Sequence, residues 1–178
     1  MKTKDLVLCS IFAAITSILS QISIPIPFTT VPLTMQIFSV ALTGMVLGSK
    51  RGFISIMIYL ILGAIGIPVF AQMSGGIAVL VGPTGGFLLG CPFMAFIVGL
   101  VCEKSSSKLY IMLSMIVGLI VAYIMGIIMF SLVTKSSLYQ SLLACVLPFV
   151  LVDIIKLILA ISAGTNIVKR VKRVVKSC

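Results

Sequence analysis

Residues 109–132 read LYIMLSMIVGLIVAYIMGIIMFSL, an apolar stretch that contains no charged side chain. A helix needs about 17 to 25 mostly apolar residues to cross the roughly 30 Å hydrocarbon core of a bilayer, so this stretch predicts a transmembrane helix. The whole chain has the same character, because 61% of its 178 residues are hydrophobic and only 9% are charged. Too few polar side chains remain to cover a soluble globule, and we therefore expect an integral membrane protein.

Apolar stretches of this kind recur along the chain and predict a single all-α domain over residues 1–178, with six transmembrane helices. They lie at 5–23, 33–49, 52–67, 83–102, 109–132 and 140–168. Lys2 and Lys4 precede the first stretch, as they would in a signal peptide. No small-residue cleavage site ahead of a polar domain follows, so we expect this first helix to be retained.

The net charge of +10 is concentrated at alternate connections between these stretches. Basic residues precede the first stretch and follow the second, fourth and sixth: Lys2, Lys4, Lys50, Arg51, Lys104, Lys108, Lys169, Arg170, Lys172, Arg173 and Lys176. The opposite connections carry only Lys135. Because Lys and Arg favour cytoplasmic loops, we expect both termini to be cytoplasmic. The basic tail then acts as a topological signal that also attracts anionic lipid, and we expect no nucleic-acid partner.

Two non-cytoplasmic connections are apolar rather than polar. The first loop, residues 23–36, contains Pro25, Pro27 and Pro32, which favour a stiff, extended backbone. The second loop, residues 67–84, has no charge and is interrupted by glycine and proline. Irregular apolar backbone is stable near lipid only where it packs against protein or lines a cavity. We therefore expect the two loops to cap a ligand pocket.

Charged residues within the last stretch are the strongest candidates for a binding site. Asp153 and Lys156, in PFVLVDIIKLILA (148–160), are the only ionisable residues well inside a predicted helix, and their spacing places them on one face. A charge at mid-membrane costs about 2.5–3.5 kcal/mol on insertion scales. Either the two residues neutralise each other along the helix, or they face the pocket and bind ligand N–H and carbonyl or carboxylate groups. Pro148 is a candidate kink near the same place.

The residue types that are missing exclude several classes of chemistry. The chain has no histidine, and its remaining acids, Asp5 and Glu103, lie near cytoplasmic ends. Imidazole metal sites, Ser-His catalysis and paired buried acids are therefore excluded, and we expect neither an enzyme nor a resident metal or cofactor. The five cysteines lack CxxC spacing, and no Walker motif is present. Transport by this chain would need an ATPase from elsewhere or an ion gradient.

Four segments in order give the chain a recognisable pattern: PFTTVPLTMQ (27–36), YLILGAIGIPVFAQMSGG (59–76), GPTGGFLLG (82–90) and PFVLVDIIKLILA (148–160). The chain resembles the BioY family, the biotin-specific substrate-binding (S) components of energy-coupling factor (ECF) transporters. This resemblance implies a six-helix protein that binds biotin under the two loops, with Asp153 and Lys156 in the biotin site. Asp153 would accept from a ureido N–H, and Lys156 would donate to the ureido carbonyl or a fixed water.

The resemblance suggests further ligand contacts in the loops. Gln72 is a candidate neutral hydrogen-bonding partner or else a solvent-facing amide, and Thr84 is a candidate helix cap. The glycines would permit close approach of backbone to ligand or tight helix entry: Gly75, Gly76, Gly85 and Gly86. The aromatics would form walls for the thiophane ring or serve ordinary packing: Phe28, Phe70 and Phe87. No arginine lies near the second loop, so the group that binds the biotin carboxylate stays open between backbone donors, Lys156 and solvent.

The resemblance also implies partners in a prokaryotic cytoplasmic membrane. A membrane coupling (T) component and two cytoplasmic ATPase (A) components would use ATP to drive uptake. In SIFAAITS (10–17), Ser10 with Ala14 and Ala13 with Ser17 form small-residue pairs for a partner helix, or for packing within the chain. Alternative functions are an S component for another vitamin and a self-sufficient secondary carrier. A carrier is expected to show a polar path or an internal repeat, and neither is visible.

Overall fold

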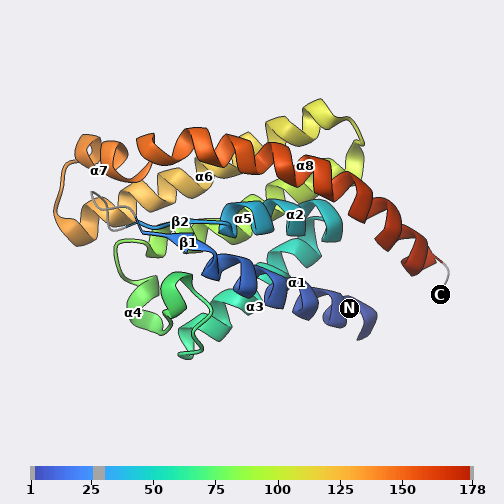
Figure 1. Ribbon diagram of the computed structural model, residues 1–178, viewed down its shortest axis with the longest axis horizontal. Helices are drawn as coiled ribbons and strands as arrows, with labels where there is room; N and C mark the ends of the chain where they lie inside the picture. Colours follow the sequence, from blue (N-terminus) through green and yellow to red (C-terminus); the bar gives the residue numbers. More distant parts are fainter. Residues whose placement is uncertain (1–2, 26–30, 177–178) are drawn as a thin grey trace.

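The computed structural model describes residues 3–25 and 31–176, with side chains to residue 168. The described part is mainly helical. Its elements in chain order are α1 (Thr3–Gln21), β1 (Ser23–Ile24), β2 (Leu33–Thr34), α2 (Gln36–Leu47), α3 (Ser49–Ala64), the 3-10 helix η1 (Ala71–Met73), α4 (Ile77–Leu80), α5 (Gly85–Lys104), α6 (Lys108–Thr134), α7 (Leu138–Cys145) and α8 (Leu147–Lys176). Figure 1 shows both chain ends toward one end of the bundle and α4 and α7 toward the other.

Among the described residues, four helices are long and apolar enough to cross a membrane: α1, α5, α6 and the Leu147–Val168 part of α8. Helices α2 and α3 are shorter, at 12 and 16 residues, and a turn at Gly48 separates them. The predicted start of the third helix at residue 52 is three residues late, because α3 begins at Ser49. There the Glu103 carboxylate of α5 accepts from the Ser49 N–H at 2.7 Å, which satisfies a free donor at the helix start.

The prediction of one helix over 140–168 is wrong. The chain forms α7 and α8 instead, and Val146 between them has φ −121° and ψ −53°. Pro148 lies in the first turn of α8, where its missing N–H leaves no intrahelical bond unmade. The proline therefore marks the beginning of a helix rather than a kink within one.

Each loop contains a small amount of regular structure that an all-α prediction does not include. In the first loop, β1 pairs antiparallel with β2, with Ser23 opposite Thr34 and Ile24 opposite Leu33. The second loop contains η1 and α4 within otherwise irregular backbone. Pro27 and Phe28 fall outside the described residues.

Close helix packing places α5 at the centre of the bundle, where it contacts α2, α3 and α6. Two glycines on one face of α5 permit the approach to α6. A Cβ atom at Gly86 would overlap the Met125 carbonyl, and one at Gly90 would overlap Ala122. Small residues at such interfaces bring helix backbones close together and increase van der Waals contact. The last helix, α8, packs against α2, α6 and α7.

A seam of buried hydroxyl groups joins the first three helices. Thr16 of α1 and Ser39 of α2 share a hydrogen bond of 2.8 Å, and Tyr59 of α3 donates to Ser20 of α1 at 3.1 Å. All four side chains are buried. Because each hydroxyl has a partner, the seam fixes the relative positions of α1, α2 and α3 without unsatisfied polar groups.

Candidate ligand-binding site

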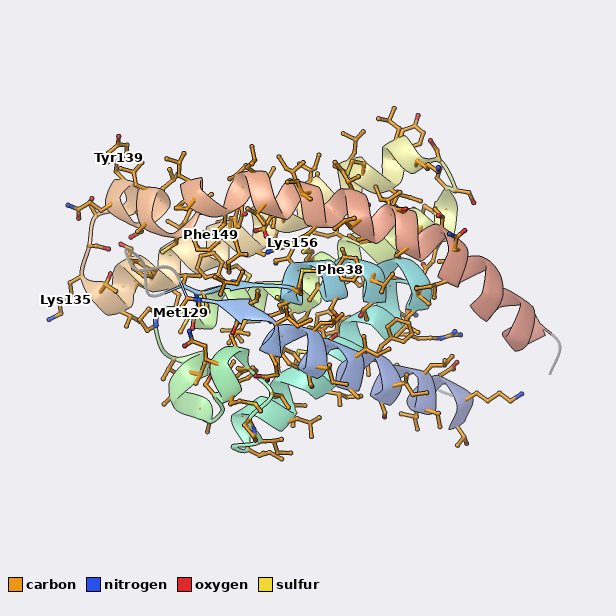
Figure 2. The ribbon with its side chains drawn as sticks, in the orientation of Figure 1. Phe38, Met129, Lys135, Tyr139, Phe149 and Lys156 are labelled. Atoms are coloured by element: carbon orange, nitrogen blue, oxygen red, sulfur yellow. The ribbon has the colours of Figure 1, made fainter. Side chains whose placement is uncertain are left out.

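A cavity of about 180 Å³ lies where the two loops meet the ends of the helices. Its lining includes residues from both loops and from α2, α5, α6, α7 and α8: Val31, Pro32, Thr34, Gln36, Ile37, Phe70, Ala71, Gln72, Ser74, Val79, Thr84, Phe87, Leu88, Cys91, Tyr123, Cys145, Phe149, Asp153 and Lys156. Figure 2 shows Phe149 and Lys156 on the side of α8 that faces the strands and α2. An apolar wall with a few convergent polar groups is typical of a small-molecule site.

Asp153 is the centre of the polar part of the cavity. One carboxylate oxygen accepts from Lys156 Nζ at 2.7 Å, and the other accepts from the Tyr123 hydroxyl at 2.6 Å. Asp153 is only 3% exposed and Lys156 only 4%. The structure therefore shows the neutralising pair and places both residues at the cavity, while the binding of a ligand by them stays a prediction. Pairing and hydrogen bonding make the burial of these charges tolerable.

Tyr123 of α6 is a site residue that the sequence does not reveal. Its hydroxyl binds Asp153, and its ring packs edge-on against Phe87, with ring centroids 6.3 Å apart. Gly126, one turn further along α6, leaves room for Phe87, because a Cβ atom there would overlap that ring. A tyrosine in a long apolar helix is an ordinary interfacial or packing residue by composition, so no sequence signal identifies its partner.

Gln36 and Cys91 form a second polar contact that the sequence does not indicate. The Gln36 amide nitrogen lies 3.7 Å from the Cys91 sulfur, and both residues line the cavity. A thiol is a weak acceptor, so this contact leaves the amide able to bind a stronger ligand acceptor. Gln36 is the first residue of α2, where the first loop ends. From there its flexible side-chain amide reaches the pocket.

Several predicted residues do line the cavity: Phe70, Gln72, Thr84, Phe87, Asp153 and Lys156. Gln72 is exposed as well, which places it at the cavity rim. Thr84 occupies the N-cap position of α5, but its side chain makes no capping hydrogen bond. The predicted cap is therefore correct in position and wrong in its side-chain bond.

The four predicted glycines lie outside the lining residues. Gly75 lies against the Ile67 carbonyl, Gly85 against the Leu80 carbonyl and Gly86 against Met125. Gly76 precedes α4 with φ +97°, a backbone conformation that favours glycine. In the structure these glycines serve the path of the second loop and the packing of α5, while Phe28 falls outside the described residues.

The small residues of α1 divide between two faces. Ser10 and Ala14 are exposed, Ala13 is buried in the core, and Ser17 is half-buried. The Ser17 hydroxyl donates to the Ala13 carbonyl at 2.9 Å within the same helix. Of the two spaced pairs, only Ser10 with Ala14 is therefore available to another helix, and Ala13 packs within the chain.

Comparison with known proteins identifies the architecture. The BioY family model matches residues 1–173. The chain belongs to the BioY family. The probable biotin transporter BioY of Pyrococcus horikoshii is 46% identical over 156 residues, which cover 88% of this chain and 91% of that protein. The biotin transporter BioY of Thermotoga maritima is 39% identical over 157 residues, again covering 88% of this chain and 91% of the relative.

A solved structure shows the same fold as well. The S-component for biotin from an ECF-type ABC transporter matches with a TM-score of 0.87 and 30% identity, covering 95% of both chains. The resemblance to the BioY family that four sequence motifs indicate is thereby confirmed. Because the BioY match extends from residue 1 to residue 173, it includes both loops and the cavity-lining part of α8.

Proposed function

We propose that this chain is a biotin-specific S component, which binds biotin and carries it across the prokaryotic cytoplasmic membrane, and that it is not an enzyme. The observation that carries the proposal is the buried group of Tyr123, Asp153 and Lys156 at a cavity under two loops, in a chain of the BioY family. The relatives named as biotin transporters support the choice of ligand.

The hydrogen-bonding capacity of the polar group suits the ureido ring of biotin. Asp153 accepts one bond at each oxygen and retains further lone pairs for ligand N–H donors. Lys156 uses one of its three donors on Asp153, which leaves donors for the ureido carbonyl or a fixed water. Apolar residues such as Phe87 and Phe149 would pack against the thiophane ring and valeryl chain.

The terminal carboxylate of biotin also needs hydrogen-bond donors from the protein. Among the described lining residues, Lys156 is the sole cation, and no arginine contributes to the cavity. Gln36 and Gln72 are neutral donors at the same cavity, so we infer that amide donors share the carboxylate with backbone or solvent. We further propose that Gly75, Gly76, Gly85 and Gly86 support ligand binding by shaping the loop and α5 rather than by touching biotin.

The arrangement in the membrane is part of the proposal. We infer one domain over residues 1–178 with six membrane-crossing helices, of which α2 and α3 are the short members. Both termini would be cytoplasmic, because the chain ends lie toward one end of the bundle (Figure 1) and the positively charged connections belong to that side. The two loops would then cover the cavity from the non-cytoplasmic side.

The proposed partners are a membrane coupling component and two cytoplasmic ATPase components, which would use ATP, while this chain holds biotin and no cofactor of its own. The exposed Ser10 and Ala14 on α1 are the candidate contact for the coupling component. The match to the S-component of an ECF-type transporter supports this assembly.

Titration of the purified protein with biotin and with other vitamins tests the ligand. Saturable binding of biotin alone supports the proposal, whereas tighter binding of another vitamin would identify a different S component. Uptake into proteoliposomes, with and without the ATPase module and ATP, tests the mode of transport. Uptake that proceeds without the module would instead identify a self-sufficient carrier.

A further inference from the structure

The side chain of Gln21, the last residue of α1, holds the second loop by three hydrogen bonds. Its amide nitrogen donates to the Pro68 carbonyl at 3.2 Å and to the Phe70 carbonyl at 2.9 Å. Its amide oxygen accepts from the Met73 N–H at 2.9 Å. One carboxamide thus joins the backbone before η1, at Pro68 and Phe70, to Met73, the last residue of η1. An amide is the neutral side chain that combines two donors with an acceptor at one end.

The segment held in this way has an unusual backbone. Gln72 and Met73 have φ values of +59° and +55°, in the left-handed region. Residues with a side chain adopt that region only where the surrounding structure holds them there. A short bridge between Phe70 and Ser74 closes the segment on itself, with the Phe70 N–H donating to the Ser74 carbonyl at 3.0 Å. The Gln21 oxygen supplies the partner for the N–H of left-handed Met73.

A second support comes from the neighbouring residue of α1. Ser20 binds the Tyr59 hydroxyl, and the Tyr59 ring packs edge-on against Phe70, with ring centroids 5.5 Å apart. Phe70 is almost fully buried and lines the cavity, and Gln72 lines it from the rim. The end of α1 therefore holds the loop backbone through Gln21 and the buried Phe70 ring through Tyr59.

We propose that Gln21 is a positioning residue for ligand binding: it fixes residues 68–73 so that Phe70 and Gln72 face the cavity, and ligand release requires its hydrogen bonds to break. The inference rests on the proposed function, because it takes biotin as the ligand. Gln21 itself does not line the cavity, so it acts through the loop. Loss of the Gln21 side chain should raise the dissociation rate of biotin and change its association rate less. An untethered loop opens more readily, so it releases bound ligand faster and still admits new ligand.

The test compares wild-type protein with Gln21→Ala, Gln21→Glu and a matched control, Gln140→Ala. Gln140 likewise bonds backbone through its side chain and does not line the cavity, but its bond lies in the capping box of α7 and not in the second loop. Biotin dissociation is followed by chase with unlabelled biotin, and amide hydrogen exchange is followed over residues 68–76. Gln21→Ala should speed dissociation by about tenfold and should also speed exchange at Met73. Gln21→Glu retains the acceptor for Met73 and loses both donors, so it should speed dissociation while sparing Met73.

Unchanged dissociation in folded Gln21→Ala would overturn the inference, as would an equal effect of Gln140→Ala. If Gln21→Ala does not fold, the dissociation rate of Gln21→Glu decides instead. Gln21→Glu keeps the acceptor for the Met73 N–H, which supports the left-handed backbone at Gln72 and Met73. Failure of the wild-type chain to bind biotin would overturn the proposed function. Wild-type binding with unaltered kinetics in both Gln21 variants would overturn the role of Gln21 alone.

Discussion

At the scale of single residues, substitutions of the buried pair Asp153 and Lys156 on α8 test the proposed binding of biotin. Asp153→Asn keeps the shape of the side chain but leaves the buried Lys156 ammonium without its counter-charge, and Lys156→Ala leaves the Asp153 carboxylate with Tyr123 only. Each change should weaken biotin binding by about tenfold or more, since bonds to charged groups contribute about 1.5–3 kcal/mol. Equilibrium titration of folded protein measures this, with the exposed Lys135→Ala as control (Figure 2). Wild-type affinity in both variants would contradict the assignment.

The contribution of the Tyr123 hydroxyl to biotin binding can be tested by itself. Tyr123→Phe keeps the ring against Phe87 and removes only the donor to Asp153. Loss of a hydrogen bond to a charged group should weaken biotin binding by about tenfold. Tyr139→Phe on α7 is the control, because Tyr139 is 71% exposed and points outward in Figure 2. An equal loss in both variants would show that the Tyr123 hydroxyl has no specific role.

The sequence predicts these residues unequally, for a physical reason. Asp153 and Lys156 are conspicuous because an ionisable group in an apolar helix needs a partner or a function. Tyr123 and Gln36 carry no such signal, since uncharged polar side chains are common in membrane helices and at their ends. Their roles depend on which helices meet, and a hydrogen bond between α6 and α8 joins positions 30 residues apart.

At the scale of helices, the contact between α5 and α6 can be tested by adding volume at Gly86. A side chain there would overlap the Met125 carbonyl, a backbone atom that cannot move away cheaply. Gly86→Val should destabilise the protein by about 1–3 kcal/mol, as overpacking does in other cores. Thermal unfolding in detergent measures the effect, and Ala14→Val at an exposed position of α1 serves as control. Equal melting temperatures for the two variants would argue against a tight interface.

Helix boundaries show where sequence patterns stop being informative. The long apolar runs that become α5 and α6 are predicted to within a few residues, because length and hydropathy suffice for them. The start of α3 depends on Glu103, which is 54 residues away in the chain. The break at Val146 lies between two apolar segments, so hydropathy does not change there. Tertiary contacts set such boundaries, and a single sequence does not display them.

At the scale of the whole molecule, the proposed orientation predicts which surface is accessible from outside the cell. Lys108 at the start of α6 and Lys135 at its end are both exposed. In a background without the five native cysteines, a membrane-impermeant thiol reagent should label Lys135→Cys in intact cells and should label Lys108→Cys only after lysis. Labelling of Lys108→Cys in intact cells would reverse the orientation.

The internal pairing of Asp153 with Lys156 has an electrical consequence for transport. Among the described lining residues these are the charged side chains, so the empty cavity carries one positive and one negative charge. Moving that cavity through the membrane field would do almost no net electrical work. A ligand with an ionised carboxylate would add one uncompensated negative charge, worth about 2.3 kcal/mol per 100 mV of membrane potential when carried across the full field. Membrane voltage should therefore act on the contents of the loaded cavity and have almost no effect on those of the empty one.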